Sequence, residues 1–222
     1  MSGYAKRLAG VVIVTAALAA AIAVYIALYL TAVPGSANAT RTASGTHLYL
    51  ATVAASKGTD ANPDWVSYYA VNSQSRDWRH ATTYVVPKNS VVHVTIFQYD
   101  GASGLRDPFL AQATGLVGGK FLLNGKPTKA INPDDASHLF AIPQLGVSVP
   151  LLGVADNAKN QCANAPCYLS NAHTTISFSF RTPDRKGLFR WQCFVPCAAG
   201  WIFGTGGPMQ TVGYMDGFIQ TV

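Results

Sequence analysis

Hydrophobic and polar residues alternate along most of the chain, in short runs separated by glycine, proline, asparagine and aspartate. In the segment 91–99, Val92, Val94 and Ile96 fall on one face, the period of two that predicts a half-buried strand. Helical periodicity is hard to find beyond residue 33. Strands are predicted at 47–53, 65–71, 82–86, 91–99, 173–180, 188–193 and 214–222. Many short strands with few helices predict a sandwich or a barrel.

An unbroken apolar run occupies residues 8–33, relieved only by threonine and tyrosine. About 20 apolar residues suffice to span a bilayer, so this run predicts a single-pass anchor. Lys6 and Arg7 before it predict a cytoplasmic stub at 1–7 and an extracytoplasmic location for the rest of the chain. Ala37-Asn38-Ala39 leaves a cleaved signal peptide as the alternative. Signal peptides have apolar cores of only about 7–15 residues, which favours the retained anchor.

Residues 34–45 are rich in small and polar residues without an apolar period, which predicts a flexible linker. Residues 46–222 are then predicted to form one extracytoplasmic domain. Within it, the segment 101–137 is interpreted as an insertion that contains its own hairpin. Asn124-Gly125 in that segment is a dipeptide that favours a type I′ turn.

Composition and charge exclude several classes of function. Charged residues make up 12% and hydrophobic residues 49%, which indicates a membrane segment or a heavily covered surface. The formal charge of +6 comes from scattered lysine and arginine without a basic stripe, so nucleic-acid binding is not expected. A hydrolase is disfavoured, because the chain has no glutamate and no Gly-x-Ser-x-Gly motif, and Asp134 and Asp135 are adjacent.

Three segments carry a resemblance to a known family: His138–Gly146 (HLFAIPQLG), Trp191–Cys197 (WQCFVPC) and Met215–Val222 (MDGFIQTV). Together they resemble cytochrome c oxidase subunit II, whose extracytoplasmic domain is a cupredoxin. In that family a His-x-Phe-x-x-Pro-x-Leu-Gly segment supplies a histidine ligand, and a Cys-x-x-x-Cys loop supplies two bridging thiolates. The resemblance implies a mostly β fold, a cupredoxin-like antiparallel β-sandwich preceded by one N-terminal transmembrane helix.

The site departs from the pattern of that family. Trp201 stands where the family has its second histidine, and an indole nitrogen is a donor only, so it cannot ligate. Gly204 stands at the expected methionine position. Soft thiolate and thioether ligands suit copper(I). The resemblance therefore implies copper as the cofactor, with an incomplete ligand set of His138, Cys193, Cys197 and Met215.

Four cysteines in an exported domain are also compatible with disulfides. Cys162 and Cys167 are predicted to form one, because the residues between them favour a turn. For Cys193 and Cys197 two interpretations stay open, a disulfide or redox-active dithiol on one side and copper ligands on the other.

The resemblance implies a membrane-anchored, subunit II-like cupredoxin of a respiratory complex of the haem-copper oxidase type. It would act in electron transfer or as a docking subunit, without catalysing a reaction by itself. The membrane and other subunits of the complex are its implied partners. The alternative is a stand-alone anchored copper carrier or thiol-disulfide protein. Either hypothesis requires the strand ending at Cys193 and the segment opening with His138 to lie side by side at one rim of the sandwich.

Overall fold

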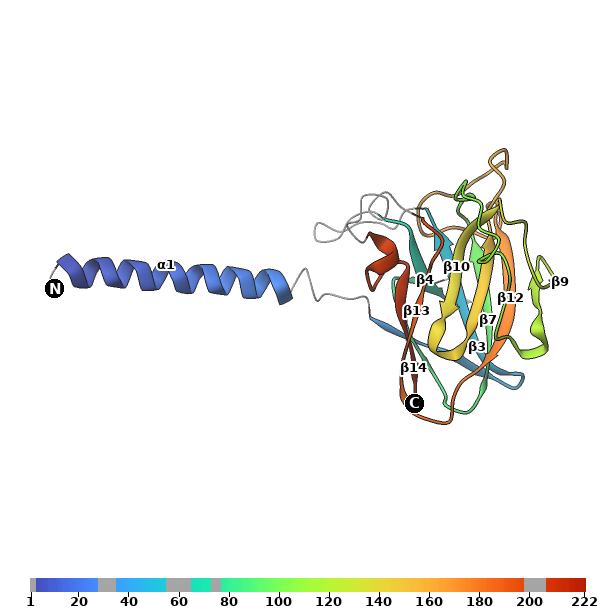
Figure 1. The fold of residues 1–222 in the computed structure, drawn as a ribbon, viewed down its shortest axis with the longest axis horizontal. Coiled ribbons are helices and arrows are strands. Elements are labelled where there is room, and N and C mark those ends of the chain that lie inside the picture. The colour runs from blue at the N-terminus through green and yellow to red at the C-terminus, as the bar shows by residue number, and fades with distance from the viewer. Residues whose placement is uncertain (1–2, 28–34, 55–64, 73–76, 198–206) are drawn as a thin grey trace. The chain divides into compact units, whose positions relative to one another are not determined.

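The computed structural model describes residues 3–27, 35–54, 65–72, 77–197 and 207–222 (Figure 1). Its one α-helix within these ranges, α1 (Gly3–Tyr25), is long and apolar enough to cross a membrane. A signal sequence near the N-terminus meets the same criteria of length and composition. The helix begins before the predicted anchor, because Ala5, Lys6 and Arg7 are good helix formers and continue its first turns. The last part of the predicted anchor, 28–33, lies outside the described residues.

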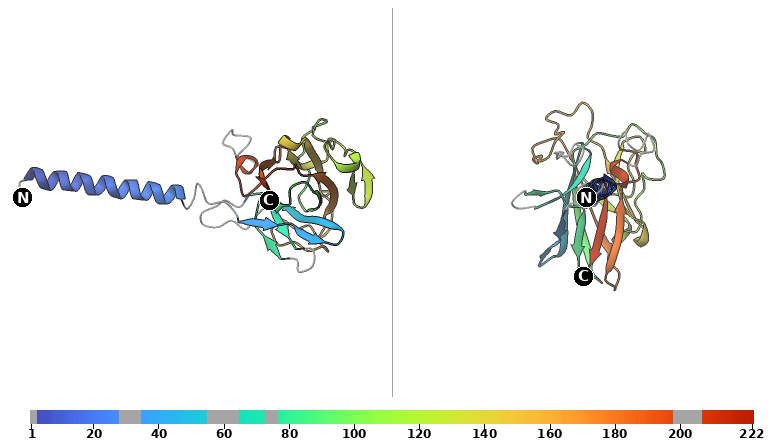
Figure 2. Two further views of the ribbon diagram at one scale, coloured as in Figure 1. Left: turned by 90° about the horizontal axis from the view of Figure 1, so that it is seen from below. Right: turned by 90° about the vertical axis from the view of Figure 1, so that its left-hand side faces the viewer.

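Two β-sheets make up the remainder of the described chain, and they lie face to face around a shared core (Figures 1 and 2). The six-stranded sheet has the order β1 (Ser36–Asn38), β6 (Thr83–Val86), β14 (Asp216–Thr221), β13 (Gly187–Gln192), β10 (Ala136–Ile142), β11 (Val147–Leu152). The eight-stranded sheet has the order β5 (Trp78–Arg79), β4 (Ser67–Val71), β3 (Gly45–Val53), β7 (Val91–Gln98), β12 (Thr174–Arg181), β8 (Phe121–Leu123), β9 (Lys126–Thr128), with β2 (Thr40–Thr42) beside β3. Short 3₁₀ turns in the described ranges are η2 (Val117–Gly119), η3 (Pro143–Leu145) and η4 (Pro208–Gln210).

The prediction of a mostly β, sandwich-like fold is confirmed, but the sheets are mixed. Strand β3 runs parallel to β7, and β6 runs parallel to both β1 and β14. The partners in each of these pairs are separated along the chain by other strands, and only antiparallel neighbours can be joined by a tight hairpin. Within each sheet, the other neighbouring strands are antiparallel, as expected.

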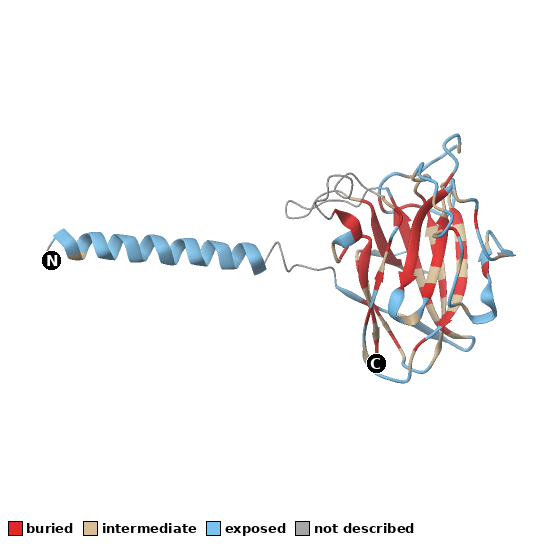
Figure 3. Cartoon of the chain, in the orientation of Figure 1, coloured by how far each residue is buried: buried red, intermediate tan, exposed pale blue. Residues whose placement is uncertain are grey.

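Alternation of apolar and polar residues places the core between the sheets (Figure 3). On β7, the side chains of Val92, Val94 and Ile96 are buried, whereas those between them are half-buried on the outer face. Strand β12 follows the same pattern with Ile176, as its sequence predicts. Strand β10 differs, because all seven of its residues are buried. Thr114, in the 101–137 segment, forms an isolated bridge to Ser148 of neighbouring β11.

Two expectations about the loops change in the structure. The residues predicted to form a linker at 34–45 contain β1 and β2, which pair with β6 and β3. These strands are held by backbone hydrogen bonds to their neighbours, and their polar side chains gave no apolar period to detect. The 101–137 segment extends the eight-stranded sheet through β8, which pairs with β12. The hairpin within it is confirmed, since Asn124 and Gly125 both have the positive φ of a type I′ turn.

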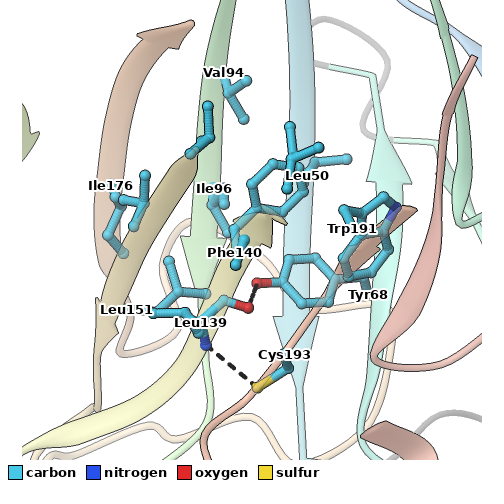
Figure 4. Packing of buried hydrophobic residues seen from close by; sticks show 14 of the residues in the cluster. Leu50, Tyr68, Val94, Ile96, Leu139, Phe140, Leu151, Ile176, Trp191 and Cys193 are labelled. Carbon is cyan, nitrogen blue, oxygen red and sulfur yellow. Dashed lines mark hydrogen bonds between the residues drawn. The ribbon is translucent and has the colours of Figure 1, made fainter. Parts of the chain in front are cut away.

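The largest buried side chain, Trp191 on β13, is surrounded by aromatic residues from both sheets. Its ring contacts Tyr68 at 4.7 Å, Phe140 at 5.3 Å and Tyr84 at 5.7 Å between centroids. The indole N–H donates to the carbonyl of Thr82 at 2.8 Å, so its polar atom is satisfied. Figure 4 shows Trp191 and Tyr68 next to Cys193, which follows β13. Within this group, burial raises the pKa of Tyr68, and the nearby thiols of Cys193 and Cys197 raise it further.

Candidate metal centre

His138 and the two cysteines of the 193–197 loop come together at one rim of the six-stranded sheet. Strands β10 and β13 are neighbours, and Ala141 pairs with Gln192, which brings His138 on β10 close to the end of β13. A ring nitrogen of His138 and the Sγ atoms of Cys193 and Cys197 lie within 4.8 Å of one another. The juxtaposition on which the sequence-based hypotheses depended is therefore present.

Cys193 and Cys197 are free thiols in this structure, with their sulfur atoms 3.8 Å apart. The other pair, Cys162 and Cys167, forms the disulfide that the sequence predicts. The 193–197 loop leaves the strand ladder immediately after Gln192. Pro196, which has no N–H to donate, prevents the strand from continuing, and the turn brings the second thiol back toward the first.

Hydrogen bonds from the backbone fix the position of Cys193. The N–H of Leu139 donates to its Sγ at 3.3 Å (Figure 4). Its own N–H donates to the carbonyl of Met215 at 2.9 Å. The carbonyl oxygen of Val195 lies 3.5 Å from Sγ. Backbone atoms of β10, of the 193–197 loop and of Met215, which precedes β14, therefore hold Cys193 in place. None of these contacts involves a flexible side chain.

Asp100 holds His138, and it was not among the residues selected from the sequence. The Oδ2 atom of Asp100 lies 2.9 Å from Nε2 of His138, and the N–H of Gly101 donates to Oδ1 at 2.8 Å. Asp100 lies two residues after Gln98, the last residue of β7, and this position was the one signal in the sequence that could have revealed it. Nδ1 of His138 is buried and has no hydrogen-bond partner among the described residues.

The burial and charges of the site favour an ion pair between His138 and Cys193. Burial opposes ionisation of Cys193, but the thiol of Cys197 and the imidazole of His138 outweigh it and lower the pKa of Cys193 to about 5. Burial likewise opposes a charged His138, but Asp100 and the Cys193 thiolate raise its pKa to about 9. The adjacent thiolate, together with burial, raises the pKa of Cys197. One thiolate is thus already formed at neutral pH.

These shifts predict how the metal-free chain responds to pH. We expect the ultraviolet absorbance of one thiolate to persist at pH 7 and to disappear as the pH falls through about 5, because the Cys193 pKa lies near that value. Because the pKa of Cys193 is lower in the folded chain than its ordinary value of 9.0, its thiolate stabilises the folded state. This stabilisation is lost as the pH falls toward 5. The His138 contribution has the opposite sign and is lost as the pH rises through about 9. A His138→Gln variant should titrate at higher pH, and an unchanged midpoint would contradict the ion pair.

Met215, Trp201 and Gly204 are the other positions that the sequence associated with the site, and the structure describes only the first. Met215 is buried beside Cys193, to which it is linked through its backbone carbonyl. Trp201 and Gly204, the positions at which the family pattern is broken, lie outside the described residues. In the part of the chain that the structure describes, the group formed by His138 and the two cysteines contains no second histidine.

The donor set fits a copper ion. Two sulfur ligands and one imidazole are soft to borderline donors of the kind that copper(I) prefers. Nδ1 of His138 is the nitrogen left without a partner, and it needs one because buried polar atoms are costly when unpaired. The bond from Nε2 to Asp100 is the carboxylate–histidine arrangement that commonly orients a metal-ligating imidazole. His138, Cys193 and Cys197 could therefore hold the ion without rearrangement of the strands.

Comparisons with known proteins give only distant likenesses. No family model matches the chain, and no curated protein matches it. The solved structures to which it is similar include reduced rusticyanin, with a TM-score of 0.33 and 15% identity over 84% of each chain. Another determination, of rusticyanin described as a copper protein, gives a TM-score of 0.32 and 14% identity over 90% of this chain and 94% of that one.

Proposed function

We propose that this chain is a membrane-anchored, cupredoxin-type copper protein that transfers single electrons outside the cytoplasm. The observation that supports it best is the approach of one imidazole and two free thiols to within 4.8 Å at the rim of a β-sandwich. The finer proposal is a subunit II-like component of a haem-copper oxidase type complex. It is supported by the order of the His138 segment, the cysteine loop and the final strand along the chain.

Burial favours a resident redox centre over a copper carrier. The exposed fraction of Cys193 is 0% and that of His138 is 1%, whereas Cys197 is half-buried. A carrier exchanges its ion with a partner by ligand displacement, which requires exposed sulfur atoms. Electron transfer, in contrast, does not require the partner protein to contact the metal ligands. The site is therefore suited to keeping its ion and exchanging only electrons.

Each residue of the site has a separate contribution. Copper bound there would supply one-electron chemistry. Asp100 binds Nε2 of His138, leaves Nδ1 without a protein partner, and stabilises positive charge on the ring. The Leu139 N–H donates to Cys193 and stabilises the thiolate. Trp191 and Tyr68 exclude water from the inner side of the site and lower its local dielectric constant, which strengthens these interactions.

The decisive experiment is copper loading of the full chain in detergent. We expect about one copper ion per chain, protection of two thiols from thiol reagents, and a reversible one-electron wave in voltammetry. Copper that binds but passes readily to a soluble chelator, without a reversible wave, would support the carrier instead. Absence of copper together with reversible formation of a Cys193–Cys197 disulfide would support a thiol-disulfide protein, and either result would refute the electron-transfer proposal.

Membership of a larger complex needs a separate test. The tagged full chain should be isolated from membranes solubilised in mild detergent, and the eluate should be recorded by visible spectroscopy. Co-purification of haem in a fixed ratio to the chain is the expected result. Isolation of the chain without haem proteins, but with copper bound, would refute the oxidase subunit while leaving a copper protein.

Asp100 provides a graded test of the site. Replacing it with asparagine keeps the side-chain size but removes the charge that pairs with His138, so we expect copper affinity to fall by about 10- to 100-fold. The measurement is competition with a chelator of known affinity. Asp184→Asn is the matched control, because Asp184 lies on the surface in an exposed pair with Lys88. Equal copper affinity of the two variants would contradict the role of Asp100.

A further inference from the structure

A second group of potential metal ligands lies on the outer face of the eight-stranded sheet. His47 on β3 and His93 on β7 are direct partners in the parallel register of these strands. Their ring centroids are 5.0 Å apart, and both side chains are half-buried. Neither belongs to the centre formed by the two cysteines.

Each imidazole is already oriented through one of its nitrogen atoms. Nε2 of His47 lies 3.0 Å from the hydroxyl of Ser44, and Nδ1 of His93 lies 2.8 Å from the hydroxyl of Ser179. These bonds leave Nδ1 of His47 and Nε2 of His93 for other contacts. Metal-ligating histidines usually have this arrangement, in which a hydrogen bond to the second nitrogen fixes the ring.

The structure leaves space beside the free nitrogen of His93. Gly45, two residues before His47 on the same face, has a φ of +128°, and a Cβ atom built there would lie 3.1 Å from Nε2 of His93. A side chain at position 45 would therefore occupy the space that an ion bound to this nitrogen needs. The two histidines also line an open groove of about 420 Å³, together with Tyr49, Thr95, Ser177, Ser179 and Lys120.

We propose that His47 and His93 bind a divalent transition-metal ion, with its open coordination positions facing this groove. Their ring centroids are 5.0 Å apart and their ring planes are inclined by 29°, so each ring turns from this stacked arrangement when the two free nitrogens bind one ion at about 2.0–2.1 Å. Imidazole ligands select copper(II), zinc or nickel(II). The residues that line the groove include no carboxylate, and Lys120 adds a positive charge, so water or a small anion completes the coordination.

This site is independent of the cysteine centre. His93 lies near the start of β7 and Asp100 lies just after its end, and seven residues of strand span about 23 Å. One ion cannot contact both groups. The two sites also differ in chemistry, because the second offers nitrogen donors without sulfur and therefore favours copper(II) over copper(I).

The test uses the full chain in detergent with Cys193→Ser and Cys197→Ser, which removes the thiol site, and copper(II) or zinc as the probe. We expect about one ion per chain in calorimetry with zinc, and a nitrogen-coordinated copper(II) signal in electron paramagnetic resonance. His47→Gln or His93→Gln in this background should weaken binding about 10-fold or more. His173→Gln is the control, since His173 lies on a different part of the sheet, in contact with Phe97 and Tyr99, and should leave binding unchanged.

Two results would overturn this proposal. One is the absence of zinc or copper(II) binding in the Cys193→Ser, Cys197→Ser background, provided that near-ultraviolet circular dichroism shows a native fold. The other is equal affinity of the His47→Gln variant and the background. If the Cys193→Ser, Cys197→Ser chain does not fold, the copper-loaded unsubstituted chain is titrated with zinc. Absence of additional bound zinc then likewise refutes the site. Copper bound through Cys193 remains unaffected by any of these outcomes.

Discussion

Replacement of Cys193 by serine is expected to abolish copper binding by the site formed by His138, Cys193 and Cys197. The copper content of this site should fall from about one ion per chain to none after dialysis against a chelator. Residues that only orient a ligand contribute about 10- to 100-fold to metal affinity, so the loss of a direct thiolate ligand should exceed about 100-fold. The same substitution removes the group whose pKa is lowered to about 5, and the acid titration of the metal-free chain should disappear with it. Metal analysis and ultraviolet titration measure the two effects on one sample.

The serine variant should remain folded, which makes the result interpretable. Its hydroxyl can accept the Leu139 N–H that Cys193 accepts, and the N–H of residue 193 can still donate to Met215. Circular dichroism and the melting temperature check this directly. His173→Gln is the matched control, because it removes an imidazole that contacts Phe97 and Tyr99 and belongs to neither metal site. Retention of copper by a folded Cys193→Ser variant, with an unchanged absorption spectrum, would exclude Cys193 as a ligand.

The sequence predicted the sandwich because its strands are half-buried, and half-burial forces apolar residues to alternate with polar ones. Val92 and Ile176 on neighbouring strands β7 and β12 are in this class. Strands β1 and β2 escaped prediction, since most of their side chains face solvent and backbone pairing with β6 and β3 holds them in place. The parallel pairing of β3 with β7 also depends on contacts between distant segments, which no local pattern encodes.

The cysteine spacing and the resemblance around His138 identified the central residues of the site. Asp100 was missed because its role depends on the end of β7 and the start of β10 lying at the same rim, a property of topology and not of spacing. The same limit explains His47 and His93. They are separated by 46 positions and become neighbours only through the register of two parallel strands. Sequence patterns therefore reveal ligands that lie close together along the chain more readily than those that the fold assembles.

Gly217→Ala is expected to cause the largest loss of stability among single substitutions in the described core. A Cβ atom at position 217 would lie 1.9 Å from the carbonyl oxygen of Thr82 and 2.7 Å from its carbonyl carbon. Those are backbone atoms of a neighbouring segment, so no side-chain rotation can relieve the clash. The same carbonyl accepts hydrogen bonds from the Trp191 indole and from the Phe218 N–H. The added methyl group must therefore displace a carbonyl that two buried donors share.

We expect the free energy of unfolding to fall by about 3 kcal/mol or more, from overpacking together with the weakened hydrogen bonds. For a domain of this size that corresponds to a melting temperature lower by roughly 6–12 °C. Gly187→Ala on β13 is the matched control, since a Cβ there would meet the Phe189 ring only at 3.5 Å, an ordinary contact. Equal melting temperatures of the two variants would contradict the packing. Gly217 pairs with Trp191, two residues before Cys193, so the clash should also displace the strand that carries the thiol and weaken copper binding.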